Sequence, residues 1–184
     1  VTESERPLAT RLWGAALRWL DTAGVKYAEE RAVGKSFMNR AEVTVILQEL
    51  ALIPALLRGT KDRATVGVLT AYSAQRQALE DAISSRREGW PEIDVAVLTV
   101  DAAQGREYDL VYYSAVRANP RGEIGFLRDE RRLNVALSRA KHGLTIVGDM
   151  GALVMAGTSF GSNAFIGIQS WMRKAPESRP VVRL

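Results

Sequence analysis

The chain has 184 residues, of which 47% are hydrophobic and 25% are charged, the balance of an ordinary globular domain. It holds no cysteine, which excludes disulfide scaffolds, cysteine-ligated zinc sites and thiol catalysis. Its apolar runs are too short for a membrane span and its first residues lack an apolar signal core, so we expect a soluble cytoplasmic protein with no membrane partner. The length predicts one domain over residues 1–184, in which 151–184 add a trailing C-terminal helix.

The net charge of +4 arises in one part of the chain. Between Arg117 and His142 there are seven basic and three acidic residues, whereas the rest of the chain is balanced. Six of the seven bases are arginines, whose planar guanidinium groups suit bidentate contact with phosphate or carboxylate. The composition fits either a phosphate-binding edge or a solvated, salt-bridged helix face.

Hydrophobic periodicity predicts alternating strands and helices. Residues 17–21 fit either a short strand or a helix end, and residues 25–28 fit a strand. Asn39 begins a long helical pattern that Gly59 closes. The other predicted helices run from Ala74 to about residue 87 with Ser73 as the cap, from a cap at Asp129 to about residue 140, and over 163–174. The other predicted strands cover 66–71, 93–100, 110–116 and 143–147, and a polar loop with two glycines covers 121–127.

These elements predict the α/β class. Strands that are apolar throughout are buried on both faces, as in a parallel sheet, and here they alternate with helices. Ligands of such sheets bind at the carboxyl ends of the strands. The segments that come directly after strands are 72–76, 101–107 and 117–119.

Three short patterns carry little functional signal. Gly34-Lys35-Ser36 resembles the end of a phosphate-binding loop, but Glu29 occupies the place of the loop's first glycine and would repel phosphate, which favours an ordinary turn. Residues 144–149 superficially resemble a strand with a magnesium-binding Asp; without the loop, a plain strand end is the better interpretation. His142 is the only histidine, so neither a Ser–His–acid triad nor a metal site is expected.

Residues 99–107 form a more specific pattern. A strand ends here, Asp101 is expected to cap a single helical turn, and Gly105 permits a left-handed exit. We expect Gln104 and Glu107 to be presented at the carboxyl edge of the sheet. The alternative is a plain connector between two strands.

The helix predicted over 131–140 carries a separate signal. Its apolar residues share one face at helical spacing. These inward positions are Leu133, Ala136, Leu137 and Ala140. Arg132 and Arg139, seven residues apart, are expected to project together from another side, with no acidic partner at i+4. They would bind an external anion or serve only as neutralised surface charge.

Together, in this order and spacing, these segments resemble the second RecA-like domain of superfamily-1B helicases, in the branch of the nonsense-mediated-decay helicase and senataxin. The resemblance covers about residues 8–149; Ala71 stands where the family usually has Pro. The segments that carry it are 34–39 with Glu42, 66–76 (helicase motif IV), 99–107 (motif V) with its continuation 108–119, and 125–127 with 131–148 (motif VI and the strand after it).

The resemblance implies a three-layer RecA-like sandwich of the P-loop NTPase type, with a mainly parallel sheet and no P-loop of its own. The phosphate loop and the magnesium-binding acids belong to an upstream RecA-like domain, which would bind most of the ATP and Mg²⁺. This chain would be the C-terminal half of an ATP-dependent helicase motor, unable to hydrolyse ATP in isolation.

The resemblance also implies roles for individual residues. Arg139 would reach the γ-phosphate, Gly105 and Glu107 would contact the nucleotide, and Gln104 and Arg132 would support the interface between the domains. The residues implied on the single-strand side are Thr70, Tyr72, Gln75 and Thr99. Domain closure around ATP and reopening after hydrolysis would move single-stranded DNA or RNA, 5′ to 3′ in this branch.

Two other functions stay open on the sequence alone. One is a non-catalytic nucleic-acid or protein-binding module that keeps the fold. The other is a small self-sufficient NTPase, which depends on Gly34-Lys35-Ser36 and is disfavoured.

Overall fold

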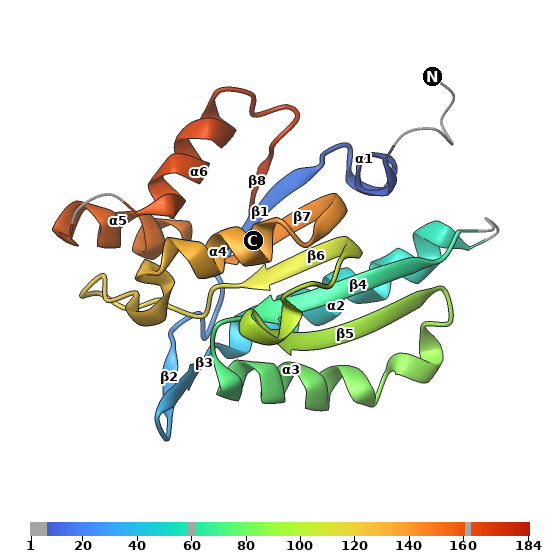
Figure 1. Cartoon of the computed structure of the whole chain (residues 1–184), viewed down its shortest axis with the longest axis horizontal. Helices are drawn as coiled ribbons and strands as arrows, with labels where there is room; N and C mark the ends of the chain where they lie inside the picture. Colours follow the sequence, from blue (N-terminus) through green and yellow to red (C-terminus); the bar gives the residue numbers. More distant parts are fainter. Residues whose placement is uncertain (1–6, 59–61, 161–162) are drawn as a thin grey trace.

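The computed structural model describes residues 7–58, 62–160 and 163–184, and these are built around a six-stranded parallel sheet (Figure 1). The strand order is β5-β4-β6-β7-β1-β8, and each neighbouring pair is parallel. The strands are β1 (Leu17–Asp21), β4 (Ala64–Thr70), β5 (Ile93–Thr99), β6 (Tyr108–Ser114), β7 (Ala140–Gly148) and β8 (Val181–Arg183). The predicted α/β class with a parallel sheet is confirmed.

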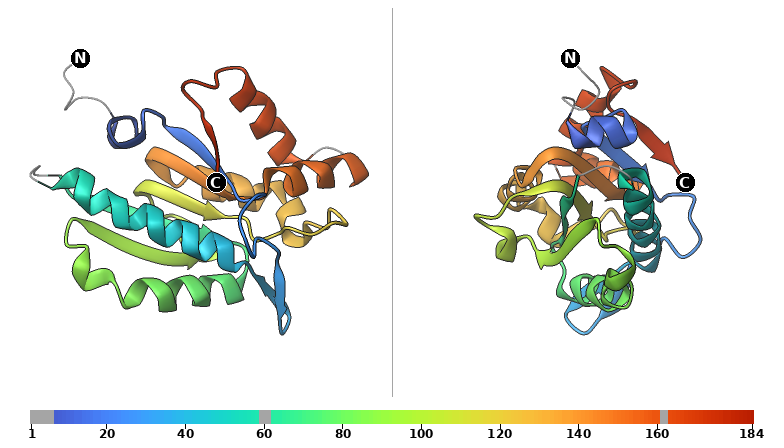
Figure 2. Two further views of the ribbon diagram at one scale, coloured as in Figure 1. Left: turned by 180° about the vertical axis from the view of Figure 1, so that it is seen from behind. Right: turned by 90° about the vertical axis from the view of Figure 1, so that its right-hand side faces the viewer.

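Helices cover both faces of this sheet and make three layers (Figure 2). One face is covered by α1 (Leu8–Trp13), α2 (Arg40–Leu57) and α3 (Ser73–Ser84). The other is covered by α4 (Glu130–Leu137), α5 (Met150–Phe160) and α6 (Ala164–Arg173). Among the residues described there are also the short 3₁₀ segments η2 (Arg87–Gly89), η3 (Asp101–Ala103) and η4 (Gly125–Arg128).

The parallel arrangement forces the chain back across the sheet between β5 and β6. Residues 100–107 make this return over the face that α4 covers, and Tyr108 then begins β6. The Tyr108 ring lies on Gly67 of β4, where a Cβ atom would come within 2.5 Å of the ring. Gly67 therefore allows the crossover to lie close to the sheet.

The sequence predicted most of the strands, but several element boundaries in the structure differ from the predicted ones. Residues 17–21 form a strand, whereas 25–28 form a loop in which Tyr27 has a φ of 65°. The helix expected to reach residue 140 ends at Leu137, because β7 already begins at Ala140. The single trailing helix expected over 151–184 is replaced by α5, α6 and the edge strand β8. Gly59, the expected end of the long helix, lies outside the described residues; α2 ends at Leu57.

The Gly34-Lys35-Ser36 segment is the turn of a two-stranded antiparallel hairpin. Strands β2 (Arg31–Val33) and β3 (Ser36–Met38) pair here, and Gly34 takes a φ of 59° in the tight turn. The strand before Gly34 returns through a tight turn directly into β3, and neither a long loop nor a helix directly follows the turn, so the interpretation as an ordinary turn is confirmed.

A buried polar network fastens the carboxyl edge of the sheet to the helices behind it. Asn39 caps α2 by accepting from the Glu42 N–H at 3.2 Å, and its own N–H donates to Gln75 Oε1 at 2.8 Å. The Gln75 amide in turn donates to the Asn39 carbonyl and to Ser114 Oγ. These four side chains have no exposed surface. Each polar atom left without its partner here would cost about 1–3 kcal/mol.

The Gln75 side chain is expected to be a main determinant of stability. Gln75→Ala leaves the Asn39 N–H without its partner and removes the hydrogen bond that Ser114 Oγ accepts, and should lower the free energy of unfolding by about 2–4 kcal/mol. Gln77→Ala, at an exposed position of the same helix, is the matched control and should change it by about 0.5 kcal/mol or less. Urea denaturation compares the two. Equal losses in the free energy of unfolding for the two variants would show that the buried network does not stabilise the fold.

Candidate functional site

A groove opens at the carboxyl ends of β4 and β5, beside the β2–β3 hairpin. It encloses about 550 Å³. Its walls include Lys35 and Ser36 of the hairpin, Tyr72 after β4, Thr99 at the end of β5, and Phe126 of η4. The strand-end position agrees with the general rule for ligand sites in parallel sheets.

The structure gathers three of the four residues implied on the single-strand side around this groove. Thr99 is half-buried in its wall. Tyr72 also lines it but is only 2% exposed, and its hydroxyl donates to the Ile124 carbonyl at 3.2 Å. Thr70 is buried behind the groove, where its Oγ1 accepts from the Tyr72 N–H at 3.4 Å. Thr70 and Tyr72 therefore shape the groove more than they face it.

Gln75 does not reach the groove. It is fully buried, and its amide oxygen and nitrogen are used by Asn39 and Ser114. In this structure the Gln75 side chain therefore belongs to the buried network and not to the groove expected to contact nucleic acid. The cause is the helical register, which turns position 75 toward β6 and α2.

The residues expected around the nucleotide lie elsewhere, along the crossover between β5 and β6. Gly105 has a φ of 79°, as predicted. Gln104 and Glu107 are exposed. Glu107, however, directly precedes β6, whose residue Leu110 pairs with Val66 near the start of β4. Glu107 is therefore at the amino edge of the sheet, and its expected place at the carboxyl edge was wrong because the chain crosses the whole sheet before β6 begins.

Asp101 does not cap the turn that it begins. The turn η3 is preceded by Val100, and no side chain caps it. The Asp101 carboxylate instead lies 3.4 Å from Arg132 Nε. Its predicted capping role is therefore replaced by an ion pair.

Arg139 lies in the turn between α4 and β7. Its Nε donates to the Val135 carbonyl and its Nη1 to the Arg106 carbonyl, both at 3.1 Å, and its Nη2 to Ser138 Oγ at 2.9 Å. Within the described residues no carboxylate pairs with it. The guanidinium is thus held beside the segment that leads to Glu107, with its positive charge uncompensated.

Arg132 and Arg139 do not share a helical face, contrary to the sequence expectation. Helix α4 ends before Arg139 and runs from the carboxyl edge of the sheet toward the amino edge. Arg132 lies at the end of α4 near the carboxyl edge, where its guanidinium carbon is 5.3 Å from the centre of the Phe126 ring. The two arginines therefore mark two different ends of one surface.

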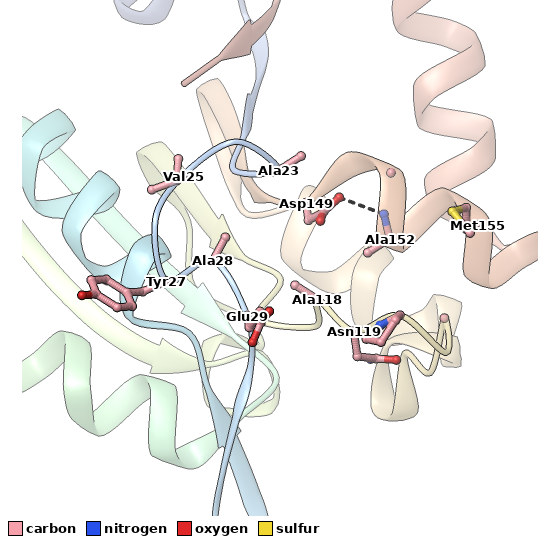
Figure 3. A pocket seen from close by; sticks show the side chains of 13 residues that line it. Ala23, Val25, Tyr27, Ala28, Glu29, Ala118, Asn119, Asp149, Ala152 and Met155 are labelled. Atoms are coloured by element: carbon pink, nitrogen blue, oxygen red, sulfur yellow. Dashed lines mark hydrogen bonds between the residues drawn. The ribbon is translucent and has the colours of Figure 1, made fainter.

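A second groove, of about 670 Å³, lies at the carboxyl ends of β1 and β7 (Figure 3). Ala23, Tyr27 and Glu29 line one side, and Asn119 and Met155 the other. Asp149 lies between them and accepts from the Ala152 N–H at 2.8 Å at the start of α5. The sequence did not predict this groove, because its walls come from three segments that only the fold brings together.

Burial raises the pKa of Glu42 to about 8, and the nearby Asp149 charge acts in the same direction. The hydrogen bonds from the Ser114 hydroxyl (2.6 Å) and from the Val116 N–H (2.8 and 3.0 Å) lower the pKa but do not offset burial. Near neutral pH this carboxyl therefore carries a proton in most molecules.

The described part of the chain contains neither a metal centre nor a membrane-spanning helix. Among residues 7–58, 62–160 and 163–184, no three His, Asp or Glu side chains gather as metal ligands would. No helix in these same ranges is both long and apolar enough to cross a membrane.

Similarity to known proteins defines the family. Residues 3–151 match a family model described as an AAA domain. A regulator of nonsense transcripts 1 homolog from Neurospora crassa is 39% identical over 125 residues, which are 66% of this chain and 11% of that protein. The ATP-dependent helicase NAM7 of Saccharomyces cerevisiae is 42% identical over 125 residues, 66% of this chain and 12% of that protein.

A third relative matches over a longer stretch. The DNA polymerase alpha-associated DNA helicase A of Saccharomyces cerevisiae is 30% identical over 168 residues, 90% of this chain and 23% of that protein. The chain belongs to the AAA-domain family. It spans 11 to 23% of the length of these three relatives, two of which are named as helicases.

The raised pKa of Glu42 predicts a pH dependence of stability. Between the unfolded value near 4.5 and the folded value of about 8, the folded protein holds a proton that the unfolded chain has lost. The free energy of unfolding should therefore fall as pH rises through this window. Glu42→Gln, which mimics the protonated group, should not show this fall.

Urea denaturation at about pH 5.5, 7 and 8.5 measures the effect. Wild type should lose stability relative to Glu42→Gln as pH rises, and the difference isolates Glu42 from other titrating groups. Parallel curves for the two proteins would show that Glu42 titrates alike in the folded and unfolded states.

Proposed function

We propose that this chain is the C-terminal half of an ATP-dependent nucleic-acid helicase motor, in which it supplies an arginine finger and part of the single-strand track. The observation that carries the proposal is Arg139. Backbone carbonyls and a neighbouring hydroxyl hold its guanidinium at the surface, with no acidic partner in the described residues. An uncompensated, preorganised arginine suits a γ-phosphate presented by another domain.

The surroundings of Arg139 support the same role. Its Nη1 donates to the carbonyl of Arg106, which holds the finger beside the Gly105–Glu107 segment. The backbone N–H of Tyr108 also donates to the Arg139 carbonyl at 2.9 Å. In the proposed motor, Gly105 and Glu107 contact the nucleotide beside the finger. Gln104 and Arg132 support the domain interface farther along α4 and the crossover.

In the proposed function, the Mg²⁺ that ATP hydrolysis requires is bound mainly outside this chain. The described residues contain no acidic cluster that fits the ion. The hairpin turn at Gly34 cannot replace a phosphate loop either. In the proposed function an upstream RecA-like domain of the same polypeptide binds Mg²⁺ and most of the ATP, and single-stranded DNA or RNA crosses both domains.

The purified 184-residue chain should show no ATPase activity, even with saturating single strand. Placing the phosphates and the metal accounts for most of phosphoryl-transfer catalysis, and the described residues provide neither element. Steady-state phosphate release measures the ATPase activity of the purified chain. Turnover at ordinary motor rates that Lys35→Ala abolishes would instead support a self-sufficient NTPase.

Arg139 should be the residue whose loss stops the motor while the domain stays folded. In the protein that joins this chain to its ATP-binding domain, Arg139→Ala should lower turnover by about 10³- to 10⁵-fold, which is about 4–7 kcal/mol of barrier. The lost hydrogen bonds are exposed or half-buried, so the melting temperature should fall by only about 2–4 °C. Arg139→Lys should also fail largely, because Lys lacks the planar fork.

Arg173→Ala serves as the control for this measurement. Arg173 is exposed at the end of α6, on an element that carries none of the proposed contacts, and its loss should leave turnover unchanged. If Arg139→Ala keeps most of its turnover, or melts far below wild type, Arg139 is structural. The chain would then fit a non-catalytic binding module better.

A further inference from the structure

Phe126 is an exposed aromatic side chain held in a defined position. It leaves 57% of its surface exposed, while Ile124 and Leu127 near it in the chain are buried. Its ring centre lies 6.1 Å from that of the buried Tyr72, and the Arg132 guanidinium carbon lies 5.3 Å from it. A protein gains stability by burying a phenylalanine, so an exposed and braced ring indicates a surface for a ligand.

Gly125 fixes where this ring projects. It has a φ of 53°, and a Cβ atom there would come within 2.7 Å of Arg117 Nη1 and 3.3 Å of the Tyr72 hydroxyl. Only glycine lets η4 pack this closely against Tyr72. The Phe126 ring consequently forms a fixed wall of the groove.

The groove that Phe126 lines also contains hydroxyl groups and a cation. Lys35 and Ser36 of the hairpin and Thr99 of β5 line it together with the start of α3. The one carboxylate among the described lining residues, Asp101, is paired with Arg132 at 3.4 Å. A planar apolar ring in one groove with hydroxyls and a lysine matches a nucleotide, whose base stacks and whose phosphate is anionic.

Two other large exposed aromatics of the described chain fit a nucleotide less well. The Trp171 ring is already covered by Arg179, whose guanidinium carbon is 3.4 Å from its centre. Tyr27 lines the second groove, where the charged residues in the wall are Glu29 and Asp149, which repel phosphate. Charge complementarity therefore selects the Phe126 groove.

We propose that Phe126 is the stacking surface of a nucleobase subsite on this domain, with Lys35 as the cation for the adjoining phosphate. The proposal rests on the proposed function, since it places one nucleotide of the single strand in the groove at the ends of β4 and β5. It adds Phe126 and Lys35 to the expected contacts at Tyr72 and Thr99. The base stacks on the ring without a specific hydrogen-bond pattern, so the subsite accepts any base.

Fluorescence anisotropy with labelled oligo(dT) and oligo(U) at low salt tests the subsite. Stacking of one base on an aromatic ring corresponds to about 5- to 150-fold in affinity, and Phe126→Ala should weaken binding within that range. Phe126→Trp should retain it. An abasic strand of equal length should bind wild type and Phe126→Ala equally. Tyr27→Ala, an exposed aromatic that also has a lysine beside it, should bind as wild type.

Lys35→Ala tests the phosphate contact separately. It should reduce the slope of log K against log salt by about 0.7, the value for one single-strand phosphate. If removal of Phe126 perturbs folding, as thermal melting would reveal, Phe126→Leu keeps apolar bulk without the π face and should show the same loss of affinity.

The outcomes separate this inference from the function on which it rests. If wild type binds single strands with strong salt dependence but Phe126→Ala and Phe126→Leu bind equally well, the subsite is wrong and the strand track stands. Equal losses on abasic strands would also overturn stacking. If wild type binds no single strand at all, the proposed track and the subsite fail together.

Discussion

The arrangement of the carboxyl edge depends on how the buried Glu42 carboxyl group binds the chain just after β6. It accepts from the Val116 N–H with both oxygens and contacts the Ser114 hydroxyl. Val116 has a φ of 71°, a conformation that costs a β-branched residue about 1–3 kcal/mol. The hydrogen bonds to Glu42 offset this strain and turn the chain away from the sheet toward Arg117.

The residues beyond this turn build the surface of the groove. The Arg117 side chain, 5% exposed, donates to Glu30 at 2.8 Å and lies over the Phe37 ring. Phe37 in turn packs edge-on against Tyr72, with ring centres 5.8 Å apart. The hairpin, η4 and the end of β4 are thereby fixed relative to one another. The amide network around Gln75 anchors the same region to α2 and α3 from behind.

The sequence predicted the fold well because apolar strands, helix caps and glycines act locally. Asp129 caps its helix as predicted, Asn39 and Asn163 cap the helices predicted to begin there, and Gly105 takes its left-handed conformation. The predictions that failed concern features that are decided by contacts between residues far apart in the sequence. Which edge of the sheet Glu107 occupies is decided by the tertiary packing of Tyr108 on Gly67. No local sequence pattern reveals this packing.

The site was predictable in part. The resemblance implied Gly105, Glu107 and Arg139 together, and the structure brings the Arg139 guanidinium onto the segment that precedes β6. The resemblance also placed Gln75 on the single-strand side, whereas in the structure its amide completes a buried network. The sequence did not predict Phe126 as a contact residue, because only the fold shows that its ring is exposed to solvent.

In the proposed motor, this domain contacts phosphate at one end of α4 and a single strand at the other, through different residues. The most direct test measures turnover and strand affinity in the same preparation of Arg139→Ala, in the protein that includes the ATP-binding domain. We expect turnover to be lost while the affinity for single strand without nucleotide stays within about twofold of wild type. A parallel fall of both quantities in a folded variant would show that the two ends are one site, and would contradict this division of roles.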